Sequence, residues 1–398
     1  MKYPITPEYI QRLPQKLQRL YLALEEYLLN DICQRFIDAN AAQETAMDKI
    51  RMLQRRGYSL NDIADYIKKF TGMTDAEFDS VMNDAVSRNQ RYYSYVISQS
   101  DIVGETFDKA MMDAEIDAIT RQTRGELVNI TRSMGFSLRV NGRTTFMPIA
   151  NAYQRVLDDA AIKVMSGGES YTQAIQSAIN ELTESGVRTV VYQRVDKNGN
   201  LRVRNEQVDV AARRAVMTAV TQVSGKYSEA LMEQTETPYM EITAHRGARD
   251  TEKPGVPWAS HKAWQGKVYS TKSGDIYPSV YAVCGLGDVE GLEGANCRHM
   301  HYPWFEGISE RTYTDEELKN IDPPPFTFQG REYTAYQATQ KMRQIERTIR
   351  KLKRMRDGYD KDTEQYKALN ARVKRLFADY KEFSDKSGNP RQVARTYT

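Results

Sequence analysis

Residues 245–305, which we call the His/Trp window, hold nearly all the side chains that could bind a metal or attack a substrate. All four histidines, all three tryptophans and two of the three cysteines lie there: His245, His261, His299, His301, Trp258, Trp264, Trp304, Cys284 and Cys297. Glycines and prolines interrupt its short apolar pieces, which predicts a small irregular domain. The flanking sequence is rich in Lys, Glu, Gln, Ala and Met at helical spacing, which is typical of scaffold.

The size and composition of the chain indicate several domains with long exposed helices. Its 398 residues are enough for two or three domains. A charged fraction of 27% and a mean hydropathy of -0.66 favour solvent-exposed helices over one thick core. No apolar run is long enough to cross a bilayer, and the N-terminus lacks the pattern of a signal peptide. We therefore expect no membrane partner, a cytosol-like compartment and, with only three cysteines, no disulfide framework.

Residues 1–134 predict a long helical N-terminal region. Pro14 can open a helix, and apolar residues then recur at three- and four-residue intervals at Leu17, Leu20, Tyr21, Leu24, Tyr27 and Leu28. Gly57 and Gly72 are predicted helix ends. Thr74 and Glu77 have the spacing of a capping box, which predicts a new helix after Gly72.

Residues 135–310 predict a central α+β domain. Asn141-Gly142 and Asn198-Gly199 each lie between strand-like segments, and both dipeptides tolerate the positive φ angles of a hairpin turn. Helical patterns follow at about 150–165, 171–184 and 207–232, and the Arg213-Arg214 pair in the last is expected on a solvated face. A predicted strand from Tyr239 to Thr243 leads into the window.

The C-terminal part begins with a proline-rich loop, residues 311–334, and continues into a basic segment over 335–386. Two apolar seams at four- and three-residue spacing predict an antiparallel helical hairpin or a coiled-coil partner site. From Lys341 to Thr398 there are 17 Lys/Arg against 8 Asp/Glu, a net +9 in a chain of +3. We expect contact with DNA or with an acidic protein surface through Lys351, Lys353, Arg354, Arg356, Arg372, Lys374 and Arg375. Residues 387–398 are expected to be a flexible tail that needs a partner to order.

A zinc site in the window is one chemically feasible hypothesis. Zinc takes thiolate and neutral imidazole donors in a tetrahedron, and His245, His261, Cys297 and His299 supply such groups. Their spacing does not favour it, because structural sites usually present close pairs such as C-x-x-C. The simpler interpretation is an irregular domain in which imidazole N–H groups and arginines satisfy buried carbonyls, with no cofactor.

An enzyme is a further alternative. Cys297 or Cys284 could be a nucleophile activated by a histidine, with Asn296 and the glycine turns nearby. A metal-dependent nuclease would need a hard-cation site, for which the acidic residues are sparse: Asp250, Asp288, Glu290 and Glu293. A toxin-like ADP-ribosyl transferase would need a late Glu-x-Glu or Gln-x-Glu pair, and the match, Gln344-Ile-Glu346, lies outside the window.

Several ordered motifs resemble the tailed-phage minor capsid protein 2 family, which is distantly similar to Mu F-like head morphogenesis proteins. The motifs are His245-Arg-Gly-Ala-Arg249, His261-x-x-Trp264-Gln-Gly-Lys-Val-Tyr-Ser270, Gly291-Leu-x-Gly294-x-Asn296-Cys-Arg-His299 and Tyr302-Pro-x-Phe305-x-Gly307. Upstream, the segments starting at Tyr171 and Arg213 are also similar, so the resemblance covers about residues 150–310. Two departures are a longer segment over 250–260 and Glu293 at a position where a cysteine is expected.

The resemblance implies a structural role and assigns no catalytic residue. It implies a phage minor capsid protein associated with the portal vertex inside the capsid, assisting head assembly and DNA packaging or delivery. Its partners would be the portal protein, other copies of the chain and packaged DNA, after synthesis in the host cytoplasm. With the helical patterns, the fold class is mainly α with a central α+β domain. The motif residues whose role is not assigned are His245, Arg249, His261, Trp264, Gln265, Gly266, Asn296, Cys297, Arg298 and His299.

Overall fold

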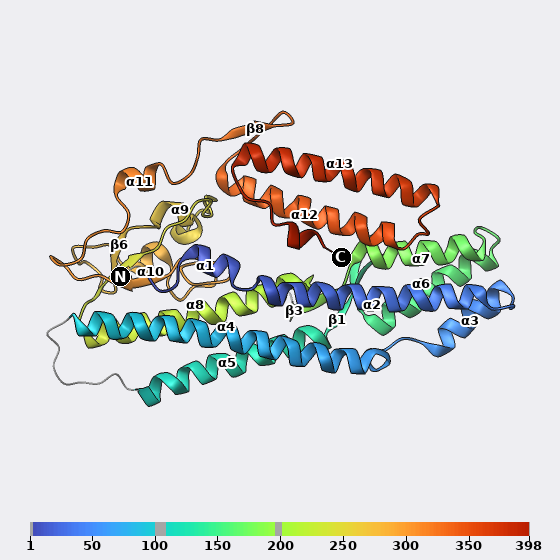
Figure 1. Cartoon of the computed structure of the whole chain (residues 1–398), viewed down its shortest axis with the longest axis horizontal. Coiled ribbons are helices and arrows are strands. Elements are labelled where there is room, and N and C mark those ends of the chain that lie inside the picture. The colour runs from blue at the N-terminus through green and yellow to red at the C-terminus, as the bar shows by residue number, and fades with distance from the viewer. Residues whose placement is uncertain (1–2, 100–108, 196–200, 398) are drawn as a thin grey trace.

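A computed structural model describes residues 3–99, 109–195 and 201–397. Long helices run along the long axis, a compact unit with short strands lies at one end, and a helical hairpin forms a layer above them (Figure 1). The predicted fold class, mainly α with a central α+β part, is confirmed. No helix among these residues is long and apolar enough to span a membrane. The helices that precede the compact unit are α1 (Pro7–Arg12), α2 (Gln15–Ala41), α3 (Ala46–Arg56), α4 (Ala64–Ser98), α5 (Lys109–Arg132), α6 (Ile149–Met165), α7 (Tyr171–Ser185) and α8 (Val208–Gln234).

Helix α8 is the central element of the long bundle and packs against α2, α4 and α5. Its buried small residues, among them Ala211, Ala215 and Ala219, let neighbouring helices approach closely on several sides. The expectation of a solvated Arg213 is wrong, because its side chain is only 8% exposed. The N-terminal helices and α6–α8 share one hydrophobic core.

Helix α4 corrects the predicted break near Gly72. It continues without interruption from Ala64 to Ser98, and the Thr74 hydroxyl donates to the Thr71 carbonyl inside the helix. A glycine within a helix costs about 1 kcal/mol, which the burial of Phe70 and Phe78 on either side outweighs. Gly57 does end α3, at a φ of 63°.

Both predicted hairpins are present in one antiparallel sheet of order β2-β1-β3-β4. Asn141 and Gly142 have φ angles of 49° and 77° at the tip of the first. The second hairpin is confirmed by its paired strands, while its Asn-Gly turn lies outside the described residues. The strands are β1 (Met134–Val140), β2 (Arg143–Pro148), β3 (Arg188–Val195) and β4 (Leu201–Gln207).

The compact unit contains a second sheet, of order β6-β5-β7. Loops and short helices surround this sheet, and Trp264, Tyr269 and Leu292 belong to its small separate core. Its elements are β5 (Tyr239–Ile242), α9 (His261–Trp264), β6 (Val268–Ser270), α10 (Val280–Cys284) and β7 (His301–Pro303). The N-terminal segment packs onto it, because Tyr3 stacks on Tyr302 at 4.2 Å between ring centroids.

The C-terminal segment forms the predicted antiparallel hairpin of α12 (Ala335–Asp357) and α13 (Glu364–Ser387), which buries its two apolar seams. It follows α11 (Asp315–Lys319), β8 (Phe326–Phe328) and β9 (Arg331–Tyr333). The expected flexible tail instead packs on α12 through a short 3-10 helix, Val393–Thr396, and Thr396 is fully buried. Tyr380 helps to fix it, since its hydroxyl accepts from the Gln392 backbone N–H at 2.8 Å. The tail therefore finds its ordering partner within the chain.

Candidate functional site

Three motif segments meet at one end of the β6-β5-β7 sheet. His245 follows β5, Gln265 precedes β6 and His299 precedes β7. Because β5 runs antiparallel to both neighbours, residues that leave β5 meet residues that enter β6 and β7. His261, at the start of α9, completes the group. Sheet topology thus gathers histidines that lie far apart in sequence.

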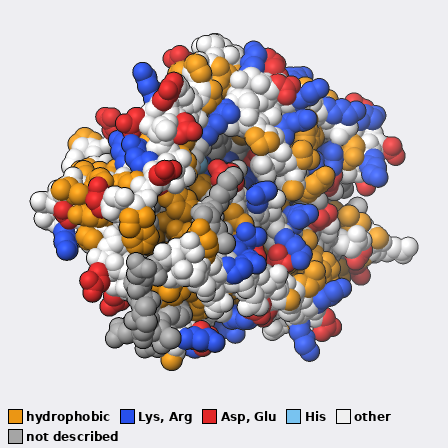
Figure 2. All heavy atoms as spheres, turned by 60° about the vertical axis from the view of Figure 1, so that its left-hand side comes forward, with side chains coloured by type: hydrophobic (Ala, Val, Ile, Leu, Met, Phe, Trp, Pro, Cys, Tyr) orange, Lys and Arg blue, Asp and Glu red, His pale blue; other side chains and the backbone are white. Residues whose placement is uncertain are grey.

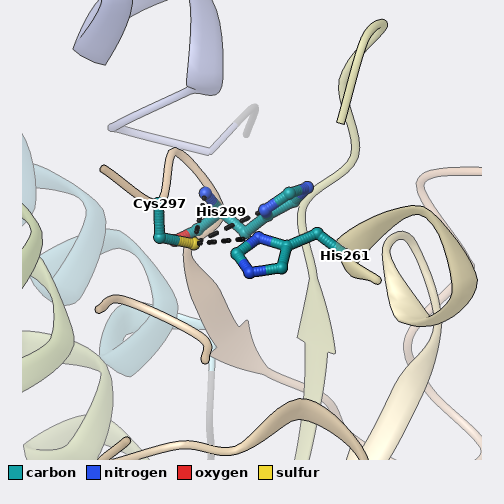
Figure 3. Close-up of side chains that lie close together, drawn as sticks. All are labelled: His261, Cys297 and His299. Carbon is teal, nitrogen blue, oxygen red and sulfur yellow. Dashed lines mark hydrogen bonds between the residues drawn. The ribbon is translucent and has the colours of Figure 1, made fainter. Parts of the chain in front are cut away.

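His261, Cys297 and His299 form a buried cluster in which two imidazoles face one thiol (Figure 3). The Cys297 Sγ lies 3.7 Å from His261 Nδ1 and 3.5 Å from His299 Nδ1. The His299 backbone N–H also points to this sulfur, at 3.4 Å. All three residues are at most 3% exposed. These residues are the group best placed to hold a metal ion in the described chain, and their soft donors suit zinc.

The hydrogen bonds behind the imidazoles fix which ring nitrogen carries the proton. His261 Nε2 lies 3.0 Å from the Glu290 carbonyl oxygen, which only accepts, so this nitrogen is the donor. Gln265 Oε1 accepts from the His245 backbone N–H and from His299 Nε2, each at 3.0 Å. Burial lowers the pKa of His261 to about 4 and that of His299 well below its usual range, so both rings are neutral. Both Nδ1 lone pairs therefore face the thiol.

The other motif residues surround and support the cluster. His245 stacks on His299 at 4.4 Å between ring centroids, and its Nδ1 lies against the Arg246 carbonyl and Arg298. His245, a candidate zinc ligand, is thus in the surrounding layer rather than in the cluster. Trp264 is buried beside His261 and His299 and donates its indole N–H to the Trp258 carbonyl at 3.2 Å.

The remaining motif residues lie around the cluster without belonging to it: Gly266, Arg249, Arg298 and Asn296. Gly266 has a φ of 69°, and a Cβ there would lie 2.3 Å from Leu318. Arg249 donates to the Glu290 carbonyl, the same group that orients His261. Arg298 donates to Gln11 of α1, while Asn296 is exposed and adopts a φ of 62°.

The buried His301 and the half-buried Glu293 form a separate pair that the motif alone does not predict. Glu293 Oε1 lies 2.7 Å from His301 Nδ1. Burial lowers the pKa of His301, but the Glu293 carboxylate outweighs burial and raises it overall. Glu293, which occupies the position where a cysteine is expected, therefore pairs with His301 and is not part of the cluster.

The cluster does not have the properties of a nucleophilic centre. An activated cysteine needs a lowered thiol pKa and an accessible sulfur. Burial instead raises the pKa of Cys297 to about 11, and Cys284 is fully buried with its pKa also raised by burial. The acidic residues considered for a nuclease do not converge either, since Asp250 binds Thr334, Glu290 pairs with Lys253, and Glu293 pairs with His301.

Comparison with known proteins agrees with the motif assignment. A profile of the family described as phage minor capsid protein 2 matches residues 5–385. The chain belongs to the phage minor capsid protein 2 family. It is also similar to a structural protein of Lactococcus phage LL-H, with 23% identity over 330 residues that cover 80% of this chain and 79% of the relative. No solved structure matches the chain.

Membership of this family confirms the resemblance and extends it beyond the motifs. The match begins in the N-terminal segment and ends in α13, so the helical arms are part of the family architecture. The chain is accordingly a structural component of a phage particle.

In this minor capsid protein, part of the basic hairpin faces inward. Arg354 binds Glu25 at 3.0 Å, and Arg350 binds Asp209 at 2.8 Å. Arg354, one of the residues expected to contact DNA or the portal protein, has a side chain that is 7% exposed and paired with Glu25. These two arginines of α12 thus pair with carboxylates of α2 and α8.

The remaining predicted contact residues differ in how accessible they are. Lys351 pairs with Glu184, Lys353 donates to the Thr396 carbonyl, and Arg356 pairs with Asp357. Arg372, Lys374 and Arg375 on α13 are exposed. The outer face of α13 is therefore where predicted contact residues remain available.

Proposed function

We propose that this minor capsid protein acts at the portal vertex, on the inner side of the capsid, where it assists head assembly and DNA packaging or delivery. Family membership supports a head component. The observation that carries the portal part of the proposal is an open groove on the compact unit with an apolar floor and an acidic rim.

This groove, of about 380 Å³, lies between the end of α8 and the loops around β5 and α10. Met232, Met240, Tyr281 and Leu286 line it. Its rim carries Glu229, Glu233 and Glu236 against one cation, Lys272, and all four are exposed. Apolar surface rimmed by charge is typical of a protein interaction site, and this charge complements a basic partner segment.

Exposed apolar side chains on nearby loops extend the candidate contact region. Ile276, Val289 and Ile308 are 68%, 68% and 82% exposed. The loops of Ile276 and Ile308 are linked by a hydrogen bond from the Tyr277 hydroxyl to Glu306 at 2.6 Å. Figure 2 brings forward the end of the molecule where the compact unit lies, and orange apolar side chains gather at the left of that view. We assign the groove to a basic segment of the portal protein.

Native mass spectrometry of the chain mixed with the portal protein of the same phage tests this proposal. Tyr281 is 52% exposed in the free chain and would be buried by the partner, so Tyr281→Asp should weaken the complex at least about tenfold. Ile162→Asp is the matched control, because Ile162 is 64% exposed and lies on α6, away from the compact unit. Absence of a complex would contradict the portal assignment. Equal binding by both variants would contradict the groove assignment.

Packaged DNA fits the outer face of α13. Arg372, Lys374 and Arg375 are exposed, and blue basic side chains gather at the upper right of Figure 2, on the hairpin side of the molecule. Each phosphate contact changes the slope of log affinity against log salt by about 0.9. Replacing all three with Ala should reduce that slope by about 3 in an anisotropy titration with duplex DNA. The control replaces the exposed Lys68 and Lys69 of α4, and an equal loss there would indicate non-specific attraction only.

A further inference from the structure

The two sulfur-to-nitrogen distances in the His261, Cys297 and His299 cluster match those of a tetrahedral zinc site. With Zn–S near 2.3 Å and Zn–N near 2.05 Å, a tetrahedral angle puts sulfur and nitrogen about 3.6 Å apart. The two distances here are 3.5 and 3.7 Å. The three donor atoms all lie within 4.8 Å of one another.

Without a cation the cluster is short of protons. The two Nδ1 lone pairs and the sulfur share the single thiol proton, so at least one buried lone pair has no donor from this group. An unmatched buried acceptor costs about 1–3 kcal/mol. A cation bound between the three atoms would satisfy all of them at once. The Glu290 carbonyl and Gln265 are already placed to orient the two rings, as carbonyl groups do behind zinc-bound histidines.

We propose that His261 Nδ1, Cys297 Sγ and His299 Nδ1 bind one Zn²⁺, with a water or another exogenous ligand in the fourth position. Binding releases the thiol proton to solvent, since the ligand is the thiolate. The ion would join α9 to the loop that enters β7, segments 36 residues apart along the chain. Its role is to fix the irregular loops that carry the motif segments at this end of the sheet.

Metal content of the full chain tests the zinc proposal. We expect about one zinc per chain after purification without chelator, and loss of that zinc in Cys297→Ser and His299→Ala. Cys33→Ser and Cys284→Ser should retain it, because neither cysteine belongs to the cluster. Circular dichroism of each variant separates loss of metal from loss of fold.

Cobalt substitution provides a direct readout of the thiolate ligand. Loaded with Co²⁺, the chain should show a sulfur-to-cobalt charge-transfer band that Cys33→Ser keeps and folded Cys297→Ser loses. No zinc in the folded chain after incubation with Zn²⁺, or zinc that Cys297→Ser keeps, would overturn the proposal.

A second, independent observation is a recess where guanidinium groups gather. It measures about 240 Å³ and lies between α1, the His/Trp window, α12 and the C-terminal tail. Arg246, Arg298, Arg343 and Arg395 line it, against Glu8 and Glu346 as the acidic lining residues. The lining therefore carries an excess of two positive charges.

Several guanidinium nitrogens in and beside this recess have no hydrogen-bond acceptor among the described residues. Arg395 Nε and Nη2 are buried without a hydrogen-bond partner, and so is Nη2 of neighbouring Arg213. The Glu346 carboxylate is shared between two partners, since it accepts a hydrogen bond from Tyr380 at 2.6 Å and lies 3.6 Å from Arg395. Burial and then Arg343 lower the pKa of Arg298 to about 10, which shows mutual repulsion in this recess.

We infer that the recess binds a small oxyanion of the phosphate class through Arg298, Arg343 and Arg395. Guanidinium forks pair with phosphate oxygens in charge-assisted hydrogen bonds. The volume suits a single phosphate group and excludes a duplex. Such an anion would hold the N-terminal helix, the window and the tail together.

Thermal unfolding at constant ionic strength tests this inference. Inorganic phosphate should raise the Tm of the chain relative to chloride, and a mononucleotide in a parallel arm distinguishes free phosphate from a nucleic-acid phosphate. The Arg343→Ala and Arg395→Ala double variant should lose the shift, whereas Arg375→Ala, an exposed control on α13, should keep it. An equal shift with acetate, or one that the double variant retains, would overturn the phosphate assignment.

Discussion

The compact unit and the α12–α13 hairpin solve the problem of holding polar groups in opposite ways. In the compact unit, neutral imidazoles, a thiol and backbone carbonyls contact one another within residues 245–301, and two imidazole lone pairs face a single thiol. In the hairpin, full charges are buried and matched by carboxylates of other helices, as in Arg350 with Asp209. The polar contacts of the first region therefore join residues of one window. The ion pairs of the second region join α12 to residues far away in the sequence, and we call these buried pairs the clamp.

The largest expected effect comes from breaking the clamp. Arg350→Ala leaves Asp209 charged and almost fully buried with only Gln18 as side-chain donor, so unfolding free energy should fall by about 3–5 kcal/mol. Urea denaturation measures this change. Arg375→Ala, on the exposed side of the same hairpin, should change stability by less than about 0.5 kcal/mol.

A paired substitution sharpens that test. Arg350→Met combined with Asp209→Leu removes both charges, and most of the lost stability should return because no buried charge remains unpaired. If the double variant is as unstable as Arg350→Ala, packing rather than charge pairing would account for the loss.

These two regions also differ in what the sequence could predict. The hairpin followed from its regular apolar spacing, yet the inward orientation of Arg354 did not, because its partner Glu25 is 329 positions away. In the window, the residue types indicated candidate ligands, but their grouping depended on sheet topology that short irregular segments do not reveal. His245 could not be separated from His261 by spacing alone. The break predicted at Gly72 failed because tertiary burial on α4 outweighed local propensity.

A smaller effect is expected at Gly266 in the compact unit. Gly266→Ala combines a left-handed backbone with a Cβ placed 2.3 Å from a Leu318 methyl group and 3.2 Å from the Ala244 Cβ, and should cost about 1–3 kcal/mol. Gly274→Ala is the matched control, since its φ is 75° but no atom lies within 4 Å of the added Cβ. It should lose only about 1 kcal/mol in the same denaturation assay. Equal losses at both positions would show that the contact with Leu318 is not tight in solution.

The smallest effect tests the continuity of α4. Gly72→Ala should raise stability by about 0.5–1 kcal/mol, because Gly72 is exposed inside a helix and the added Cβ meets nothing. Gly57→Ala should lower it by about 1 kcal/mol, since Gly57 ends α3 at a positive φ. Destabilisation by Gly72→Ala would restore the helix break that the sequence suggested.

Cross-linking mass spectrometry of intact phage particles tests the central claim most directly. The exposed Lys253, Lys267 and Lys272 lie on the compact unit and can report its neighbours. The account predicts cross-links from these lysines to the portal protein. Cross-links to the major capsid protein alone, from particles in which portal cross-links are otherwise detected, would contradict a location at the portal vertex.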